Sequence, residues 1–239
     1  MKRMKITKSI LLIIGIIFYS IVSVFYIIPW SKSQIILSSF NQNINHILSY
    51  QIVTLAITLI FLFFIYISNK DIFKIYFKIG DSKSKVLPEA IIGLKPKKYD
   101  NWKSIGINFT VIITVVTIIV MYFSITDKTF NYNNFLTFIP FVFIFSLSNS
   151  FVEEIMYRFG VIIALKNIIS DKKIALISGL IFGSIHYFGT PGGLIGVIVA
   201  GFLGWFLAKS IIETKGIFWA YLIHFLQDFV IFSALLLFI

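Results

Sequence analysis

The chain contains no cysteine in its 239 residues, and this absence excludes several kinds of chemistry. There can be no disulfide, no thiolate ligand for a metal and no cysteine nucleophile. Charged residues are scarce as well: they make up 13% of the chain, whereas hydrophobic residues make up 58%. Because soluble domains carry about 25% charged residues, this composition indicates an integral membrane protein.

The charges that are present are mostly basic and give a formal net charge of +11. The basic residues separate apolar runs instead of forming one patch, which argues against nucleic acid as a partner. In a membrane protein such residues set the orientation and attract anionic headgroups. The expected partners are therefore the lipid bilayer and a membrane-associated peptide or protein. The chain is short and shows no eukaryotic targeting signal, so we expect it in a bacterial plasma membrane.

The apolar runs predict an all-α fold, a polytopic transmembrane helical bundle of about seven spans. The expected spans are residues 9–28, 50–68, 104–124, 135–169, 174–187, 194–211 and 216–239. With the N-terminus in and the C-terminus out, Lys32 and Lys128 are the only basic residues outside. This asymmetry predicts the orientation, because basic residues concentrate on the cytoplasmic side.

Three shorter features refine this prediction. A short interfacial helix is expected near residues 35–40. In the polar region 69–103, Lys70, Lys74 and Lys78 share one helical face, which fits a surface helix and a solvated linker equally well. Small residues at helical spacing in span 194–211 predict a buried central helix; they are Gly196, Ala200, Gly201, Gly204 and Ala208.

Only three of the ten acidic residues lie within apolar segments, namely Glu153, Glu154 and Asp228. An ionisable group at the centre of a transmembrane helix costs about 2.5–3.5 kcal/mol, so these groups need partners. His186 and His224, in later apolar segments, are the candidates. Polar groups of this kind can also serve only to hold helices together.

The spacing of these residues separates their expected roles. On a helix, Glu154 and Arg158 share a face and form an ion pair, whereas Glu153 points about 100° away. One glutamate is then neutralised and the other stays available as a base. Phe182 lies one turn before His186, and His224 and Asp228 lie on one face of the last span.

The depth of the groups constrains the helix that carries the glutamates. His186 lies about 18 Å from the inner boundary, and Glu153 is level with it if the helix continues to about Asn167. Residues 135–167 as one straight helix would be about 50 Å long, too long for a core of about 30 Å. We therefore expect a bend, tilt or break near residues 146–150, with the glutamates after it.

A carboxylate base and histidines in a dry site fit two kinds of hydrolytic chemistry. One is water activation with stabilisation of an oxyanion, which needs no cofactor. The other uses one divalent metal such as zinc, bound by His186, His224 and Glu153. Both alternatives remain open from the sequence.

The glutamate pair with Arg158, the Phe182–His186 pair and the His224–Asp228 pair resemble the three motifs of the CPBP family. These are the CAAX-protease and bacteriocin-processing membrane proteins, also called the abortive infection family. The resemblance covers residues 135–230, and asparagine is common in the family where Asp228 stands. Residues 1–130 show no family signature; we expect N-terminal transmembrane helices and a basic cytoplasmic loop there, and the catalytic core in residues 131–239.

The resemblance implies an intramembrane endopeptidase that cleaves a CAAX-type, pheromone or bacteriocin-related substrate. It implies that Glu153 activates water with His186 as its partner, and that His224 and Asp228 stabilise the oxyanion or bind metal. Glu154, Arg158 and Phe182 would support the site. The alternatives are a non-catalytic bacteriocin self-immunity or scaffold protein of the same fold, and a transporter with a proton relay. The transporter predicts an internal repeat, and none is visible.

Overall fold

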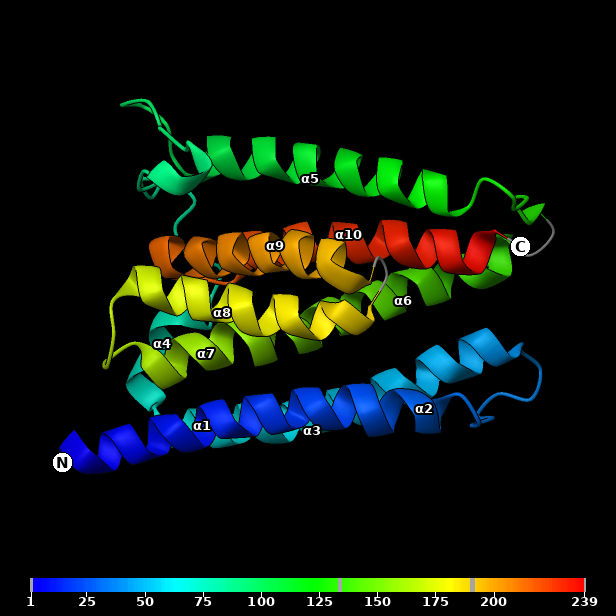
Figure 1. Ribbon diagram of the computed structural model, residues 1–239, viewed down its shortest axis with the longest axis horizontal. Coiled ribbons are helices and arrows are strands. Elements are labelled where there is room, and N and C mark those ends of the chain that lie inside the picture. The colour runs from blue at the N-terminus through cyan, green and yellow to red at the C-terminus, as the bar shows by residue number, and fades with distance from the viewer. Residues whose placement is uncertain (1, 133–134, 190–191, 239) are drawn as a thin grey trace.

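The computed structural model describes residues 2–132, 135–189 and 192–238. Long helices lie side by side along one axis and confirm the predicted all-α fold (Figure 1). In chain order they are α1 (Lys2–Val22), the π-helical η1 (Ser23–Ile27), α2 (Ile28–Ser31), α3 (Gln42–Ser68), α4 (Lys70–Tyr76), the 3-10 turn η2 (Ala90–Ile92), α5 (Trp102–Ser124), α6 (Phe135–Glu153), the π-helical η4 (Glu154–Phe159), α7 (Gly160–Leu165), α8 (Asp171–Ile185), the 3-10 turn η5 (His186–Phe188), α9 (Gly193–Thr214) and α10 (Phe218–Leu237).

Six helical segments within the described residues are long and apolar enough to cross a membrane. They are Ile6–Ser31, Gln42–Ser68, Trp102–Ser124, Phe135–Leu165, Gly193–Thr214 and Phe218–Leu237. The remaining predicted span, residues 174–187, corresponds to α8 (Asp171–Ile185), which has 15 residues and is therefore about 22 Å long. Figure 1 shows α8 running beside the longer helices and ending before they do. The prediction of about seven spans therefore holds, with one of them short.

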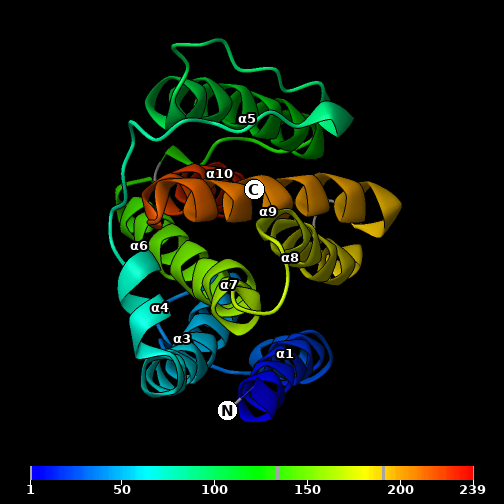
Figure 2. The same cartoon turned by 90° about the vertical axis from the view of Figure 1, so that its left-hand side faces the viewer.

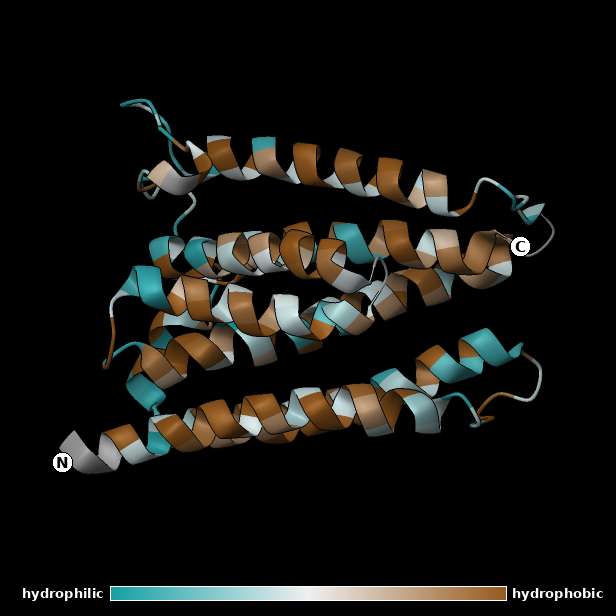
Figure 3. Ribbon diagram, viewed as in Figure 1, coloured by the Kyte–Doolittle hydropathy of each residue, from teal (hydrophilic) through white to brown (hydrophobic). Residues whose placement is uncertain are grey.

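The two ends of the bundle differ in charge. The chain termini lie at opposite ends (Figure 1), as an odd number of passes requires. Polar residues gather at the ends and apolar residues along the helices (Figure 3). Lys32 follows α2 and Lys128 follows α5, so both lie at the end opposite the N-terminus. This distribution is the basis for placing the N-terminus inside.

The connection between the first two spans differs from the prediction. Residues 35–40 form turns, so the expected interfacial helix is wrong. The side chain of Asn45 explains this, because its Oδ1 accepts hydrogen bonds from the amides of Ile36 and Leu37 at 2.8 and 2.7 Å. These backbone groups are satisfied without a helix. Helix α3 instead begins at Gln42, where Asn41 caps it by accepting a hydrogen bond from the amide of Ile44.

Helix α4 confirms the surface-helix alternative for the start of the basic region. Figure 2 shows α4 lying across the ends of neighbouring long helices. Lys70, Lys74 and Lys78 are exposed. On its other side Phe73 packs against Phe159, with ring centroids 5.3 Å apart, so α4 contacts the π-helical turn that follows the glutamates.

The prediction for residues 146–150 allowed a bend, a tilt or a break, and the break is absent because the helix that carries the glutamates is continuous from Phe135 to Leu165. There the hydroxyls of Ser146 and Ser150 bond to carbonyls four residues earlier, within regular α-helix. The irregularity comes later, at η4. The 31 residues would measure about 46 Å as a straight α-helix, and the segment fits because it is tilted across the bundle (Figure 2).

Helix α9 lies inside the bundle, as its small residues predict, and packs most extensively on α8. The contact depends on glycine. A Cβ at Gly183 would lie 2.6 Å from the carbonyl oxygen of Val197 and 2.9 Å from the Cα of Gly201. Both are backbone atoms that cannot turn aside, so α8 and α9 reach this distance only because position 183 has no side chain.

Candidate active site

The glutamates lie where α6 changes into the π-helical turn η4. Glu153 is the last residue of α6 and Glu154 the first of η4. The amide of Gly160 donates to the carbonyl of Ile155, five residues earlier, which is the hydrogen bond of a π-helix. Such turns are frequent at functional sites. The wider turn changes the directions of neighbouring side chains, and here both carboxylates reach the same histidine.

That histidine is His224 of α10, which is buried between the two glutamates. Its Nδ1 lies 2.7 Å from Oε1 of Glu154, and its Nε2 lies 3.2 Å from Oε2 of Glu153. Asp228, one turn along α10, approaches the same Nε2 at 3.8 Å. Because an ionised carboxylate only accepts hydrogen bonds, both ring nitrogens are donors when the glutamates are ionised. His224 is then an imidazolium held from both sides.

Asn149 is a site residue that the sequence reasoning missed. Its Nδ2 lies 3.2 Å from Oε1 of Glu153 and 3.2 Å from Oδ2 of Asp228. The signal was available, since Asn149 precedes Glu153 by four residues and shares its helical face. The amide joins α6 to α10 beside His224.

Phe182 of α8 lies at the centre of the remaining site residues. The Arg158 guanidinium carbon stands 3.6 Å from the centre of its ring, a cation–π contact within a fully buried arginine. The Nε of Arg158 also lies 3.4 Å from Oε1 of Glu154, which forms the predicted ion pair. The His186 ring packs on Phe182 at 4.2 Å, and its Nδ1 lies 2.8 Å from the carbonyl oxygen of Phe182.

The structure therefore brings all seven predicted site residues into one cluster, but it alters one predicted pairing. The closest contact of Glu153 with a histidine is to His224 and not to His186. Because Nδ1 of His186 donates to the Phe182 carbonyl, the other nitrogen, Nε2, is left for a substrate. The role of each residue in catalysis stays a prediction.

The N-terminal helices also reach this site, although their sequence shows no family signature. The Ser20 hydroxyl of α1 donates to the hydroxyl of Tyr157 in η4 at 3.4 Å. The hydroxyls of Ser23 in η1 and Tyr50 in α3 are 3.1 Å apart. A single sequence gives no signal for these contacts, because hydroxyl side chains are common in membrane helices.

The donor groups do not fit a metal ion as arranged. Among the described residues, no three His, Asp or Glu side chains converge as metal ligands do. A histidine ligand needs a ring nitrogen with a free lone pair. Both nitrogens of His224 face carboxylates, and Nδ1 of His186 is engaged by a backbone carbonyl. The set His186, His224 and Glu153 would have to rearrange to bind a metal.

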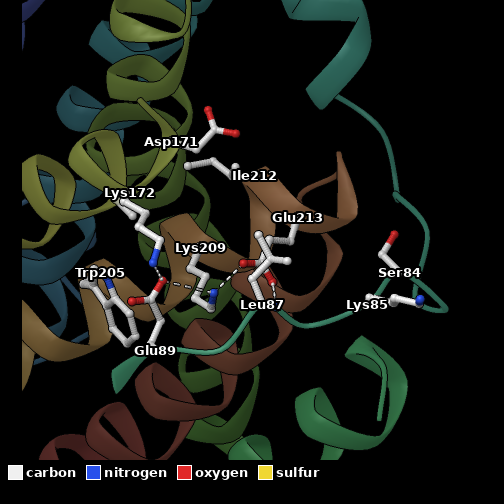
Figure 4. Close-up of a pocket in the computed structure, with 11 residues that line it drawn as sticks. Ser84, Lys85, Leu87, Glu89, Asp171, Lys172, Trp205, Lys209, Ile212 and Glu213 are labelled. Carbon is white, nitrogen blue, oxygen red and sulfur yellow. Dashed lines mark hydrogen bonds and ion pairs between the residues drawn. The ribbon is translucent and has the colours of Figure 1, made fainter. Parts of the chain in front are cut away.

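A cavity of about 360 Å³ lies elsewhere, where the basic loop meets α8 and α9 (Figure 4). Lys209 lies at its centre and pairs with Glu213 and, at 3.6 Å, with Glu89. The second oxygen of Glu213 accepts hydrogen bonds from Trp102 Nε1 and the Leu87 amide, at 2.9 and 3.1 Å. These contacts attach the loop to α9 and include no residue of the candidate active site.

The comparison with known protein families concerns the same part of the chain. Residues 135–230 match the family described as type II CAAX prenyl endopeptidase Rce1-like. The matched segment contains all seven predicted site residues and Asn149. No curated protein and no solved structure matches the chain. Residues 135–230 are therefore similar to the Rce1-like family of CAAX endopeptidases.

Proposed function

We propose that the protein is an intramembrane endopeptidase in which Glu153 activates water. The observation that carries this proposal is the position of Glu153. Its side chain is 16% exposed, whereas the side chain of its neighbour Glu154 is 3% exposed and paired with Arg158 and His224. Glu153 is therefore the glutamate that a water molecule and a substrate can reach.

The step is a hydrolysis without a covalent intermediate. Glu153 takes a proton from water, and the oxygen attacks the carbonyl carbon of the scissile bond. When the carbon–nitrogen bond breaks, the proton passes from Glu153 to the leaving amine. His224 holds the Glu153 carboxylate through Nε2, at 3.2 Å, and so keeps the base in one direction.

The proposed oxyanion donor is His186. Its ring is fixed by Phe182, and it is only partly buried. With Nδ1 donating to the Phe182 carbonyl, protonated His186 presents Nε2–H to the oxyanion. Asp228 balances the charge of His224. We propose that no metal takes part, because both ring nitrogens of His224 face carboxylates.

The proposed substrate is a peptide or protein held at the membrane, with a CAAX-type, pheromone or bacteriocin-related cleavage site. The family match and the position of the glutamates within a segment that can span a membrane support this proposal. The proposed location is a bacterial plasma membrane, and the charge distribution supports an orientation with the N-terminus inside.

The test is cleavage of a membrane-tethered peptide library by the protein in lipid vesicles. The library contains each peptide with and without a C-terminal prenyl group. Glu153→Ala and His186→Ala are expected to abolish cleavage, and a chelator is expected to leave it unchanged. Inhibition by the chelator, reversed by zinc, would refute the metal-free mechanism. Full cellular function in both variants would instead favour the non-catalytic immunity or scaffold role.

A further inference from the structure

Asn149 closes a ring of contacts around the proposed base. Glu153 faces His224 with Oε2 and faces Asn149 with Oε1. Asp228 faces His224 with Oδ1, at 3.8 Å, and faces Asn149 with Oδ2. Each carboxylate therefore uses one oxygen for the histidine and the other for the amide, and neither can rotate without losing a contact.

The direction of the Asn149 amide follows from chemistry. Its nitrogen carries two N–H groups, and its oxygen carries none. Ionised Glu153 and Asp228 only accept hydrogen bonds, so the nitrogen must be the atom that faces them. One N–H serves each carboxylate, at 3.2 Å in both cases.

This arrangement addresses a problem that His224 alone does not solve. Glu153 and Asp228 approach the same Nε2, and two like charges this close disfavour each other's ionisation. A neutral double donor stabilises both carboxylates without supplying a proton acceptor that would compete with Glu153. A lysine or arginine at position 149 would add a charge. A serine would offer one donor, its O–H, in place of the two N–H donors of asparagine.

We propose that Asn149 is a positioning residue of the hydrolytic site, which fixes the directions of the Glu153 and Asp228 carboxyl groups. The inference rests on the proposed function, because it assigns Asn149 a role through the base. The alternative is a purely structural role, in which the amide only joins α6 to α10 as polar groups between membrane helices do. The two differ in what Asn149 variants change.

The experiment compares two substitutions of nearly equal size in vesicles, with a peptide that the wild type cleaves. Asn149→Leu removes both donors, and Asn149→Asp replaces them with a third carboxyl group. We expect kcat to fall about 10- to 100-fold in Asn149→Leu and further in Asn149→Asp, with KM within twofold. Ser150→Ala is the matched control: Ser150 is buried on the same helix, and its hydroxyl bonds to the backbone of Ser146. It should keep wild-type kcat.

Repeating the Asn149→Leu measurement in the Glu153→Gln variant separates the positioning role of Asn149 from the proposed function of the protein. If Asn149 acts through Glu153, Asn149→Leu causes no further loss when Glu153→Gln is already present. Three results for Asn149→Leu would overturn the positioning role alone. They are an equal loss of kcat with and without Glu153→Gln, a change confined to KM, and an unchanged kcat while Glu153→Gln is inactive. Wild-type cleavage by Glu153→Gln would overturn the proposed function and the positioning role together.

Discussion

The attachment of the basic loop to α9 allows a quantitative prediction about Lys209→Met. The Lys209 side chain is 5% exposed and that of its partner Glu213 is 8% exposed. Removing one partner of a buried ion pair leaves an unpaired buried charge and costs about 3–5 kcal/mol. Here Glu213 keeps two hydrogen bonds, from Trp102 and the Leu87 amide. We therefore expect the lower end of this range, about 3 kcal/mol.

Because Lys209 pairs with Glu89 of the loop and Glu213 bonds to the Leu87 amide of the loop, the cost should appear as opening of the loop. At 1.36 kcal/mol for each factor of ten, about 3 kcal/mol raises the open population roughly a hundredfold. Cleavage of the folded protein by trypsin follows that population when opening is fast. The assay is the initial rate of cleavage at Lys83, Lys85, Lys97 and Lys98 in the loop.

Two further variants test the reasoning. Lys172→Met removes only an exposed partner of Glu89, since the Lys172 side chain is 70% exposed, and should change the rate less than about fivefold. The double variant Lys209→Met with Glu213→Gln removes the unpaired charge but keeps an acceptor for Trp102. It should return most of the way to the wild-type rate. A wild-type rate of tryptic cleavage in Lys209→Met, or no recovery of that rate in the double variant, would show that the charge of Lys209 does not hold the loop to α9.

Three other predictions concern the site. Gly183→Ala should separate α8 from α9 and lower kcat at least tenfold, measured as peptide cleavage in vesicles, because a Cβ there meets backbone 2.6 Å away. Gly15→Ala, whose Cβ meets nothing within 4 Å, is its control and should be neutral. His224→Gln should lower kcat by about 10²-fold or more through loss of the contacts to both glutamates, whereas a loss seen only in KM would contradict this. Glu154→Gln should lower the melting temperature more than Glu153→Gln does, since Glu154 is the buried partner of Arg158; equal melting temperatures would contradict it.

The site could be predicted from the sequence because its residues are costly in a membrane. A buried Glu153, Glu154 or Asp228 needs partners, and few polar groups are available in the later apolar segments. The i,i+4 pair Glu154–Arg158 follows from helix geometry alone. The sequence therefore predicts which residues form the cluster, with the exception of Asn149, whose uncharged amide did not stand out.

The pairing of the histidines could not be predicted in the same way. Depth along the helix axis put Glu153 level with His186, but depth does not say which way a side chain points. That direction depends on η4, and η4 depends on packing between helices. The Ser178 hydroxyl of α8 donates to the Tyr157 carbonyl in η4 at 2.7 Å, a contact between residues with no sequence signal.

The start of α3 illustrates a second limit of hydropathy. Residues 42–49 are polar enough to suggest a loop, yet Asn45 and Ser49 are buried within α3. The polar side chain of Asn45 bonds to the preceding loop, where its Nδ2 donates to the Leu37 carbonyl at 3.0 Å. Hydropathy counts such a side chain as exposed, although its partners are inside the protein.

The cleavage rate of Glu153→Gln is the most direct test of Glu153 as the base. The amide has the size of the carboxylate and still accepts a hydrogen bond from His224, but it cannot take a proton from water. For a peptide that the wild type cleaves in vesicles, the account predicts that kcat falls at least about 10²-fold while the melting temperature is kept. A kcat within twofold of wild type would contradict it.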